Sequence, residues 1–239
     1  MQLQTLLNNP RRVAGVCGIG FLLLFVIGGP VLQGTTPTMN DSVADIRSYW
    51  IDNGDRYLVG DFVFSVGVML FFLPFVLAFQ SVLQPVDRSG GMWARIMVGG
   101  AVVAVALGGA GAASNGAIAL IGPQSLDDAT LRLATVTAAY SLGGLGLGFA
   151  VMLIGASIVI AQTGVVWRWL AILGGLAAAA SILGGLWVTT QDQEGIFGVI
   201  GFVGLNLSLL WVLLVAVQLL LPQGSRVEAP RPVPSPAAN

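Results

Sequence analysis

Histidine and lysine are both missing from the 239-residue sequence, so all ten of its basic residues are arginine. Without histidine the chain has no imidazole for haem or zinc ligation, for a Ser-His dyad or for a proton relay. Without lysine it has neither a Schiff-base amine nor a P-loop lysine. These absences exclude the commonest enzyme chemistries. We therefore expect that the chain is not an enzyme and that it carries no cofactor.

Cysteine and charge are also scarce. Cys17 is the single cysteine, so no internal disulfide can form, and one thiol cannot hold an iron–sulfur cluster or a structural zinc. Charged residues make up 9% of the chain and hydrophobic residues 56%, whereas soluble domains are roughly 25% charged. A soluble fold could not cover its surface with so few charges, which indicates that most of the chain lies in lipid. The net charge of −1 gives no reason to expect nucleic acid as a partner.

Long apolar runs are what the sequence has in abundance. A hydrocarbon core of about 30 Å needs about 20 residues of helix, and six runs are long enough. They predict an all-α fold, a polytopic membrane helix bundle of six transmembrane helices within residues 1–221. The expected spans are about 13–33, 58–80, 95–119, 131–161, 168–190 and 195–221.

Two segments outside these runs have their own character. Residues 42–52 can form a short amphipathic helix on the outer leaflet, capped by Asp41 or Ser42 and ended by Asn53-Gly54. Residues 222–239 are rich in proline and have no apolar periodicity. They predict a disordered cytoplasmic tail.

The arginines predict the orientation of the bundle. With a cytoplasmic N-terminus, seven arginines lie inside and three outside, which agrees with the excess of basic residues in cytoplasmic loops. Both termini are then cytoplasmic. We expect a multi-pass protein of the cell (plasma) membrane, and a bacterial inner membrane is the expected location. The inner set is Arg11, Arg12, Arg88, Arg95, Arg168, Arg226 and Arg231, and the outer set is Arg47, Arg56 and Arg132.

Small residues recur at four-residue spacing in three of the spans. Such rows let helix backbones approach closely, which strengthens packing that lipid cannot replace. They serve either to pack the bundle or to bind a membrane-protein partner or a second copy. The rows are Gly100, Ala104, Gly108 and Ala112, then Gly144 and Gly148, and then Gly174 and Ala178.

Asp127 and Asp128 form an acidic pair that resembles a metal or catalytic site at first. Ser125 can cap the following helix, with Asp128 in the capping-box position three residues later. Acids are favoured in the first turn of a helix, and Arg132 is spaced to pair with Asp128. We interpret the pair as the start of the fourth span, with a metal or substrate site as the alternative.

Polar residues gather in the predicted outer half of the bundle. Asp61 opens the second span, and an ionisable group at membrane depth is costly and by default a functional candidate. Counting along the helices predicts that Asn115, Tyr140 and Asn206 reach the outer half as well. Our hypothesis is an outward-facing polar vestibule lined by these four residues. The alternatives are that Asp61 stays among the headgroups, paired with an arginine, and that Tyr140 and Asn206 only bridge helices.

The outer segment and the second span also resemble a family. The residues that carry the likeness are Thr36-Pro37, Ile46-x-x-Tyr49-Trp50, and the charged entry from Asp52 to Asp61 before an aromatic-rich helix. The sequence resembles uncharacterised small actinobacterial multi-span membrane proteins of about six helices, and the likeness covers most of the chain. It implies the six-span fold and carries over no activity and no functional residue.

Three classes of function are consistent with these features. An accessory or interaction subunit of a larger membrane complex fits the small-residue rows and the absence of catalytic groups. A small-solute or ion transporter with an outward-facing vestibule is the alternative and fits Asp61, although no larger internal repeat is visible. An intramembrane enzyme fits least. The expected partners are the lipid bilayer and a membrane-protein partner or a second copy of the chain, and not nucleic acid.

Overall fold

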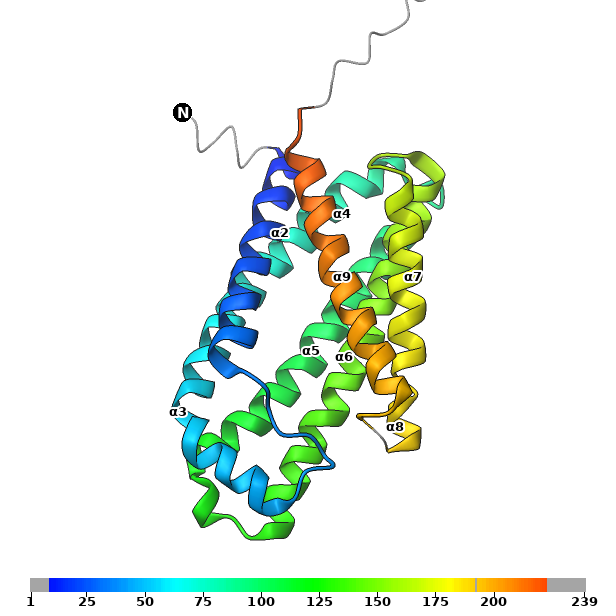
Figure 1. The fold of residues 1–239 in the computed structure, drawn as a ribbon. Helices are drawn as coiled ribbons and strands as arrows, with labels where there is room; N and C mark the ends of the chain where they lie inside the picture. Colours follow the sequence, from blue (N-terminus) through cyan, green and yellow to red (C-terminus); the bar gives the residue numbers. More distant parts are fainter. Residues whose placement is uncertain (1–8, 192, 223–239) are drawn as a thin grey trace, which may run out of the picture.

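The computed structural model describes residues 9–191 and 193–222, and within these ranges the chain consists of helices joined by loops, with no strand (Figure 1). Six helical units in the described residues are long and apolar enough to cross a membrane. The prediction of an all-α, six-span fold is therefore confirmed. The units are Pro10–Gln33, Val43–Val86, Met92–Ile121, Asp128–Thr163, Trp169–Thr190 and Ile196–Leu220.

The first unit changes its helical form midway. Helix α2 (Pro10–Val26) is capped by Asn9, whose side chain accepts hydrogen bonds from the backbone amides of Arg11 and Arg12. It continues as the π-helix η1 (Ile27–Gln33), which contains Pro30. Proline cannot donate the usual helical hydrogen bond, and a π-turn is one way in which a helix accommodates this loss.

The second unit is longer than any lipid core requires. It comprises α3 (Val43–Gly67), the π-helix η2 (Val68–Phe72), α4 (Leu73–Leu83) and the short 3-10 turn η3 (Gln84–Val86). These 44 residues extend over about 65 Å, so the first turns of α3 project beyond a core of about 30 Å.

The predicted separate outer helix over residues 42–52 is instead the beginning of α3. Ser42 caps it as expected, with its hydroxyl oxygen 3.2 Å from the amide nitrogen of Asp45. The helix does not end at Asn53-Gly54, because the Asn53 side chain donates to the carbonyl of Tyr49 within the helix and Gly54 fits against Ala119 of the next unit. Trp50 is buried beside Leu131, away from lipid.

The third and fourth units form a closely packed helix pair. Helices α5 (Met92–Ile121) and α6 (Asp128–Thr163) are joined by the 3-10 turn η4 (Pro123–Ser125). A Cβ atom placed on Gly100 would lie 2.4 Å from the backbone nitrogen of Met152, and one on Gly148 would lie 2.5 Å from that of Ala104. Only glycine permits these two backbones to approach so closely.

The acidic pair starts α6 with different partners from those predicted. Asp127, rather than Ser125, is the N-cap, and its carboxylate accepts from the Thr130 amide at 2.8 Å. Asp128 pairs with Arg47 of α3 at 2.8 Å, and not with Arg132. Ser125 is not the N-cap because it belongs to the 3-10 turn η4, and the N-cap of α6 lies two residues later, at Asp127.

The last two units complete the bundle. Helices α7 (Trp169–Gly184), α8 (Trp187–Thr190) and α9 (Ile196–Leu220) follow α6. Helix α9 packs against α2, where Gly15 and Gly18 lie against Ala216, and against α7, where the Trp211 indole donates to the Leu170 carbonyl at 2.8 Å. Figure 1 shows α2 and α9 close together at one end of the bundle and apart at the other.

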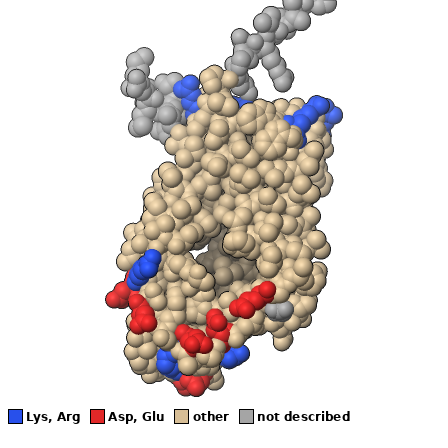
Figure 2. Space-filling model, viewed as in Figure 1, with Lys and Arg blue, Asp and Glu red and all other residues tan. Residues whose placement is uncertain are grey.

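Both described chain ends lie at the same end of the bundle, where α2 begins and α9 ends (Figure 1). Arginines gather at that end and acidic residues at the opposite end (Figure 2). We call these the arginine end and the acidic end. Apart from Pro222, the predicted tail over residues 222–239 lies outside the described residues.

A candidate binding cavity near the acidic end

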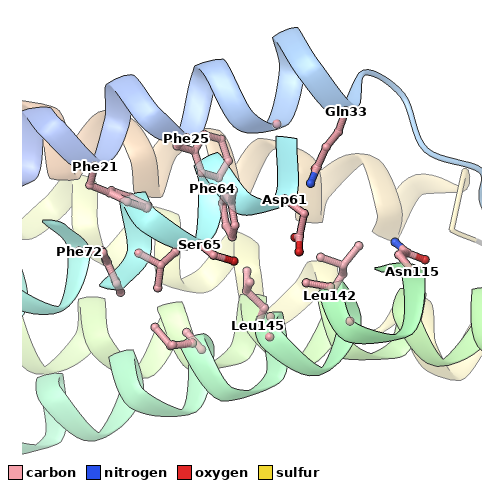
Figure 3. A pocket seen from close by; sticks show the side chains of 18 of the residues that line it. Phe21, Phe25, Gln33, Asp61, Phe64, Ser65, Phe72, Asn115, Leu142 and Leu145 are labelled. Atoms are coloured by element: carbon pink, nitrogen blue, oxygen red, sulfur yellow. The ribbon is translucent and has the colours of Figure 1, made fainter. Parts of the chain in front are cut away.

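A cavity of about 260 Å³ lies among α2–η1, α3–η2, α5 and α6 (Figure 3). Its wall is mostly apolar and rich in aromatic rings. Polar side chains gather toward the acidic end of the cavity. The lining rings are Phe21, Phe25, Phe64, Phe72 and Phe149, and the lining polar residues are Gln33, Thr36, Tyr57, Asp61, Ser65 and Asn115.

Two π-helical segments border this cavity. Gly29 and Gln33 of η1 line it from one side, and Val68, Met69 and Phe72 of η2 line it from another. A π-turn inserts one extra residue into a helix and redirects the side chains around it, and such turns are frequent at functional sites. The π-helical segments of the first two spans therefore both line the same cavity.

Small residues supply the space in the cavity. Helix α5 faces it with Ala104, Gly108, Gly109, Gly111 and Ala112, which have little or no side chain. The opposite wall is held by a close contact between η1 and α3, since a Cβ atom on Gly28 would lie 2.7 Å from the carbonyl oxygen of Gly60. This contact sets the position of the next residue along α3, Asp61.

Asp61 is the only charged residue among those that line the cavity. Its side chain is half-buried, and within the described residues it has no ion pair and no hydrogen-bond partner. The two arginines of α3 that could pair with it, Arg47 and Arg56, are engaged elsewhere. Arg56 donates to the Val31 carbonyl, and Arg47 donates to carbonyls of the loop between α5 and α6 and pairs with Asp128. The carboxylate is left uncompensated inside a largely apolar space.

The neighbours of Asp61 along the cavity are neutral polar groups. Tyr57 lies one helical turn earlier on α3 and is hydrogen-bonded to the Asn115 side chain of α5. Gln33 and Asn115 lie at the same end of the cavity in Figure 3, with the Asp61 carboxylate between them and the aromatic end. These groups can donate and accept hydrogen bonds but cannot neutralise a charge.

The structure brings together two of the four predicted vestibule residues. Asp61 and Asn115 line the cavity. Tyr140 and Asn206 lie elsewhere: the Tyr140 hydroxyl points to the Val188 carbonyl at 3.5 Å, and the Asn206 amide donates to the Phe202 carbonyl of its own helix at 2.8 Å. Gln33, Tyr57 and the aromatic wall were not predicted. The sequence Gly28-Gly29-Pro30, which interrupts the first span, was the available signal for the η1 side of the cavity.

A second cavity of about 350 Å³ adjoins the first between α6, α7 and α9. Both are lined by Leu142, Leu145, Phe149 and Leu205. Figure 2 shows a hollow on the face between the diverging parts of α2 and α9, directly beside the band of acidic residues. The two cavities thus form neighbouring chambers near the acidic end.

A segment over residues 34–41 crosses the acidic end of these chambers. The Thr38 hydroxyl donates to the Glu194 carboxylate at 3.2 Å, and the Met39 amide donates to the Gln193 side chain at 3.4 Å. Arg132 donates to the Met39 carbonyl at 3.4 Å. The segment is therefore held to the start of α9 and to α6 by single hydrogen bonds.

Aromatic side chains close the cavity toward the arginine end. Ring centroids are 6.4 Å apart for Phe72 and Phe75, 5.8 Å for Phe75 and Phe79, and 6.0 Å for Phe79 and Trp211. All four side chains are almost completely buried. We call these four residues the aromatic column, which extends from Phe72 in the cavity wall toward the arginine end.

The predicted rows of small residues are used inside the bundle. Gly100, Ala104 and Gly148 form the α5–α6 crossing, Gly108 faces Leu145, and Gly144 faces Leu107. Gly174 faces Ser157 and Trp211, Ala178 is buried, and Ala112 lines the cavity.

No family model, curated protein or solved structure matches the chain. The arrangement of the site is therefore the basis for a functional interpretation. In the described residues no three cysteine or acidic side chains are grouped closely enough to hold a metal ion. What the cavity offers is one uncompensated carboxylate, several neutral hydrogen-bonding groups and an aromatic wall.

Proposed function

We propose that the chain is a small-solute transporter of the plasma membrane and that it binds its solute in the cavity beside Asp61, from the outer side. The observation that carries this proposal is the half-buried Asp61 carboxylate, which has no partner in the described residues and faces an open space. Leaving a charge in such a place is costly unless something binds to it. A charge kept at membrane depth for structure alone would be expected to have a protein partner.

The orientation is part of the proposal. Five arginines flank the spans at the arginine end in the described residues, and three lie toward the acidic end. The excess of basic residues favours the arginine end as cytoplasmic. The cavity then lies in the outer half of the bundle, and the aromatic column separates it from the cytoplasm. Transport would require these rings to move, and the π-helix η2 adjoins them.

An accessory subunit of a larger complex is the competing proposal. It drew its support from the small-residue rows, but these rows pack α5 against α6 and α7 against its neighbours. The cavity is therefore the stronger support, and we place solute binding before the subunit proposal.

Thiol labelling tests whether water reaches the cavity from outside. In a Cys17→Ser background, a charged, membrane-impermeant methanethiosulfonate added to intact cells is expected to modify Ser65→Cys and Asn115→Cys. Two control positions should stay unmodified: Leu70→Cys, where Leu70 is 63% exposed on the outer surface of η2, and Val76→Cys, where Val76 is 2% exposed beside the aromatic column. Protection of the two cavity thiols would contradict an outward-facing site.

Solute uptake tests the transport step. Cells that express the wild-type chain, Asp61→Asn or Asp55→Asn are grown in the same medium, and their soluble contents are compared by mass spectrometry. Asp55 lies on the same helix and is exposed outside the cavity. We expect at least one solute whose accumulation depends on the wild-type chain and is retained in Asp55→Asn but lost in Asp61→Asn. Identical profiles for the three chains at equal expression would reject transport.

A further inference from the structure

We propose that the ligand of the cavity is a small amphiphilic cation, in which one apolar body carries an ammonium group that pairs with Asp61. This inference rests on the proposed function, because it names the class of solute for the same site. It follows from four observations: the charge of the cavity, the order of its polar and aromatic groups, its size and the direction in which it opens.

The charge of the cavity selects a cation. Asp61 is the one charged residue in the lining, and no arginine side chain is among the lining residues. At the acidic end, the described carboxylates of Asp41, Asp45, Asp52, Asp55, Asp127, Asp128 and Glu194 outnumber Arg47, Arg56 and Arg132. Like-signed charges around an opening raise the local concentration of oppositely charged solutes. An anion would meet repulsion both at this end and at Asp61.

The order of groups along the cavity matches an amphiphile. Figure 3 shows Phe21 and Phe72 at one end and Gln33 and Asn115 at the other, with Asp61 between them. The ring centroids of Phe21 and Phe72 are 4.8 Å apart, and those of Phe72 and Phe149 are 5.5 Å apart. Such a wall binds an apolar group by burial and attracts a nearby cation through its ring faces. Phenyl rings offer no oxygen or nitrogen ligands to a small hydrated metal ion.

The size of the space limits the ligand. At about 260 Å³ the cavity is slightly smaller than the pockets of roughly 300–1,000 Å³ that hold drug-sized ligands. It can enclose a single ring or a short chain with its ammonium group. The space beside Asp61 cannot by itself enclose a lipid with two acyl chains, although a chamber of about 350 Å³ adjoins it. We therefore infer a small free cation, and a lipid headgroup is the competing occupant in the test below.

The direction of the opening gives the cation a route. Helices α2 and α9 are in contact at the arginine end, where Gly18 lies against Ala216. They separate toward the acidic end, and the hollow in Figure 2 lies between them. Phe25 of α2 and Leu205 of α9 both line the cavity at this gap. In the proposed orientation an opening between two spanning helices faces the outer leaflet, and an amphiphile lies at the boundary of headgroups and acyl chains with its apolar part in lipid.

Binding of 4-phenylbutylammonium to the full chain in maltoside micelles tests the inference. The neutral analogue 4-phenyl-1-butanol has almost the same shape without the charge. We expect the cation to bind about ten- to hundredfold more tightly than the alcohol, as is typical of a hydrogen bond to a charged group. Asp61→Asn should lose this preference, and Asp55→Asn should keep it. Phe149→Leu should weaken binding of both compounds, because it removes part of the aromatic wall.

Three results would overturn the inference. Equal affinity for the cation and the alcohol would show that charge is not recognised, and an unchanged preference in Asp61→Asn would show that Asp61 is not the partner. Displacement of the probe by liposomes containing phosphatidylethanolamine, but not by liposomes of phosphatidylglycerol alone, would identify a lipid headgroup as the occupant. Circular dichroism and gel filtration of each variant establish that it is folded before binding is measured.

The inference and the proposed function fail in different ways. If the cavity thiols are labelled and uptake depends on Asp61 while 4-phenylbutylammonium does not bind, transport stands and the cation is rejected. If the cation binds but no uptake depends on Asp61, the ligand class stands and transport is rejected. If the cavity thiols are unlabelled and the cation does not bind, both are rejected.

Discussion

Gly100 and Gly99 are neighbours on α5, yet a methyl group would meet quite different surroundings at the two positions. A Cβ atom on Gly100 would lie 2.4 Å from the backbone nitrogen of Met152 and 2.8 Å from the carbonyl oxygen of Gly148. A Cβ atom on Gly99 would have no atom of another helix within 4 Å. Since backbone atoms cannot rotate away as a side chain can, the added methyl at position 100 must push α5 and α6 apart.

We therefore expect Gly100→Ala to destabilise the bundle by about 1–3 kcal/mol, the usual cost of overpacking a close contact. Gly99→Ala serves as the matched control and should leave stability unchanged or slightly higher, because alanine favours helix. The measurement is thermal unfolding in detergent, followed by circular dichroism. Equal midpoints for the two variants would show that the α5–α6 crossing tolerates separation.

Asp87 anchors the turn between α4 and α5 at the arginine end. Its carboxylate accepts hydrogen bonds from the Ser89 hydroxyl at 2.6 Å, the Ser89 amide at 2.9 Å and the Ala94 amide at 3.1 Å. Burial by itself would raise the pKa of Asp87, but the hydrogen bonds from Ser89 and Ala94 outweigh it and hold the pKa below its usual value. Hydrogen bonds that favour the charged form act in this direction.

The lowered pKa makes the contribution of Asp87 to stability dependent on pH. In the folded chain the carboxylate binds its proton less readily than in the unfolded chain, so its stabilisation is complete above the unfolded pKa of about 4 and disappears as the pH falls through the lower folded value. We expect Asp87→Asn to lower stability at pH 7 by on the order of 1 kcal/mol. The difference from wild type should shrink below about pH 4, as measured by unfolding midpoints across pH. A constant difference would mean that the charge of Asp87 is irrelevant.

At the scale of elements, α3 connects the outer turns of the chain to the cavity. Its first turns pack Ile46 and Trp50 against Ile118 of α5 and Leu131 of α6. Arg47, on the same turns, donates to the carbonyls of Pro123 and Leu126 in the loop between α5 and α6. This contact supplies hydrogen-bond donors to two partly buried carbonyls of the loop.

We expect Arg47→Met to cost more stability than Asp128→Asn, although the two residues form one ion pair. The Asp128 side chain is 77% exposed, and an exposed pair contributes about 0–1 kcal/mol. Loss of Arg47 also leaves two partly buried carbonyls without their donor, which adds on the order of 1 kcal/mol. Unfolding midpoints of both variants and of the double variant measure this. If the two single variants cost the same, the carbonyl contacts contribute nothing.

The helices also show which structural features can be predicted from the sequence and which cannot. The number and approximate position of the spans follow from the length of the apolar runs, because hydrocarbon thickness sets helix length. Counting residues also gives height along a helix, but not the direction in which a side chain points around it. That direction depends on packing, which turned Tyr140 toward Val188 and Asn115 toward Tyr57. The continuity of α3 past Asn53-Gly54 involves a contact with Ala119 of another helix, so it could not be predicted from the local sequence either.

For the whole molecule, the separation of charges and the position of the cavity are linked. The arginine end contains the starts of α2, α5 and α7, and the acidic end contains the start of α3 and the α5–α6 loop. The cavity lies toward the acidic end and the aromatic column toward the arginine end. Under the proposed function, the side of the membrane that the acidic end faces is the side from which the solute enters.

We expect the acidic end to face outward, because basic loops are retained in the cytoplasm. In a Cys17→Ser background, an impermeant maleimide should label Asp55→Cys on intact cells. Ser89→Cys, in the turn between α4 and α5, should be labelled only after the cells are lysed. Labelling of both after lysis shows that each thiol is accessible and each variant is present. The reverse pattern on intact cells would invert the bundle, so the cavity would open to the cytoplasm and the same Asp61 would recognise solutes on their way out.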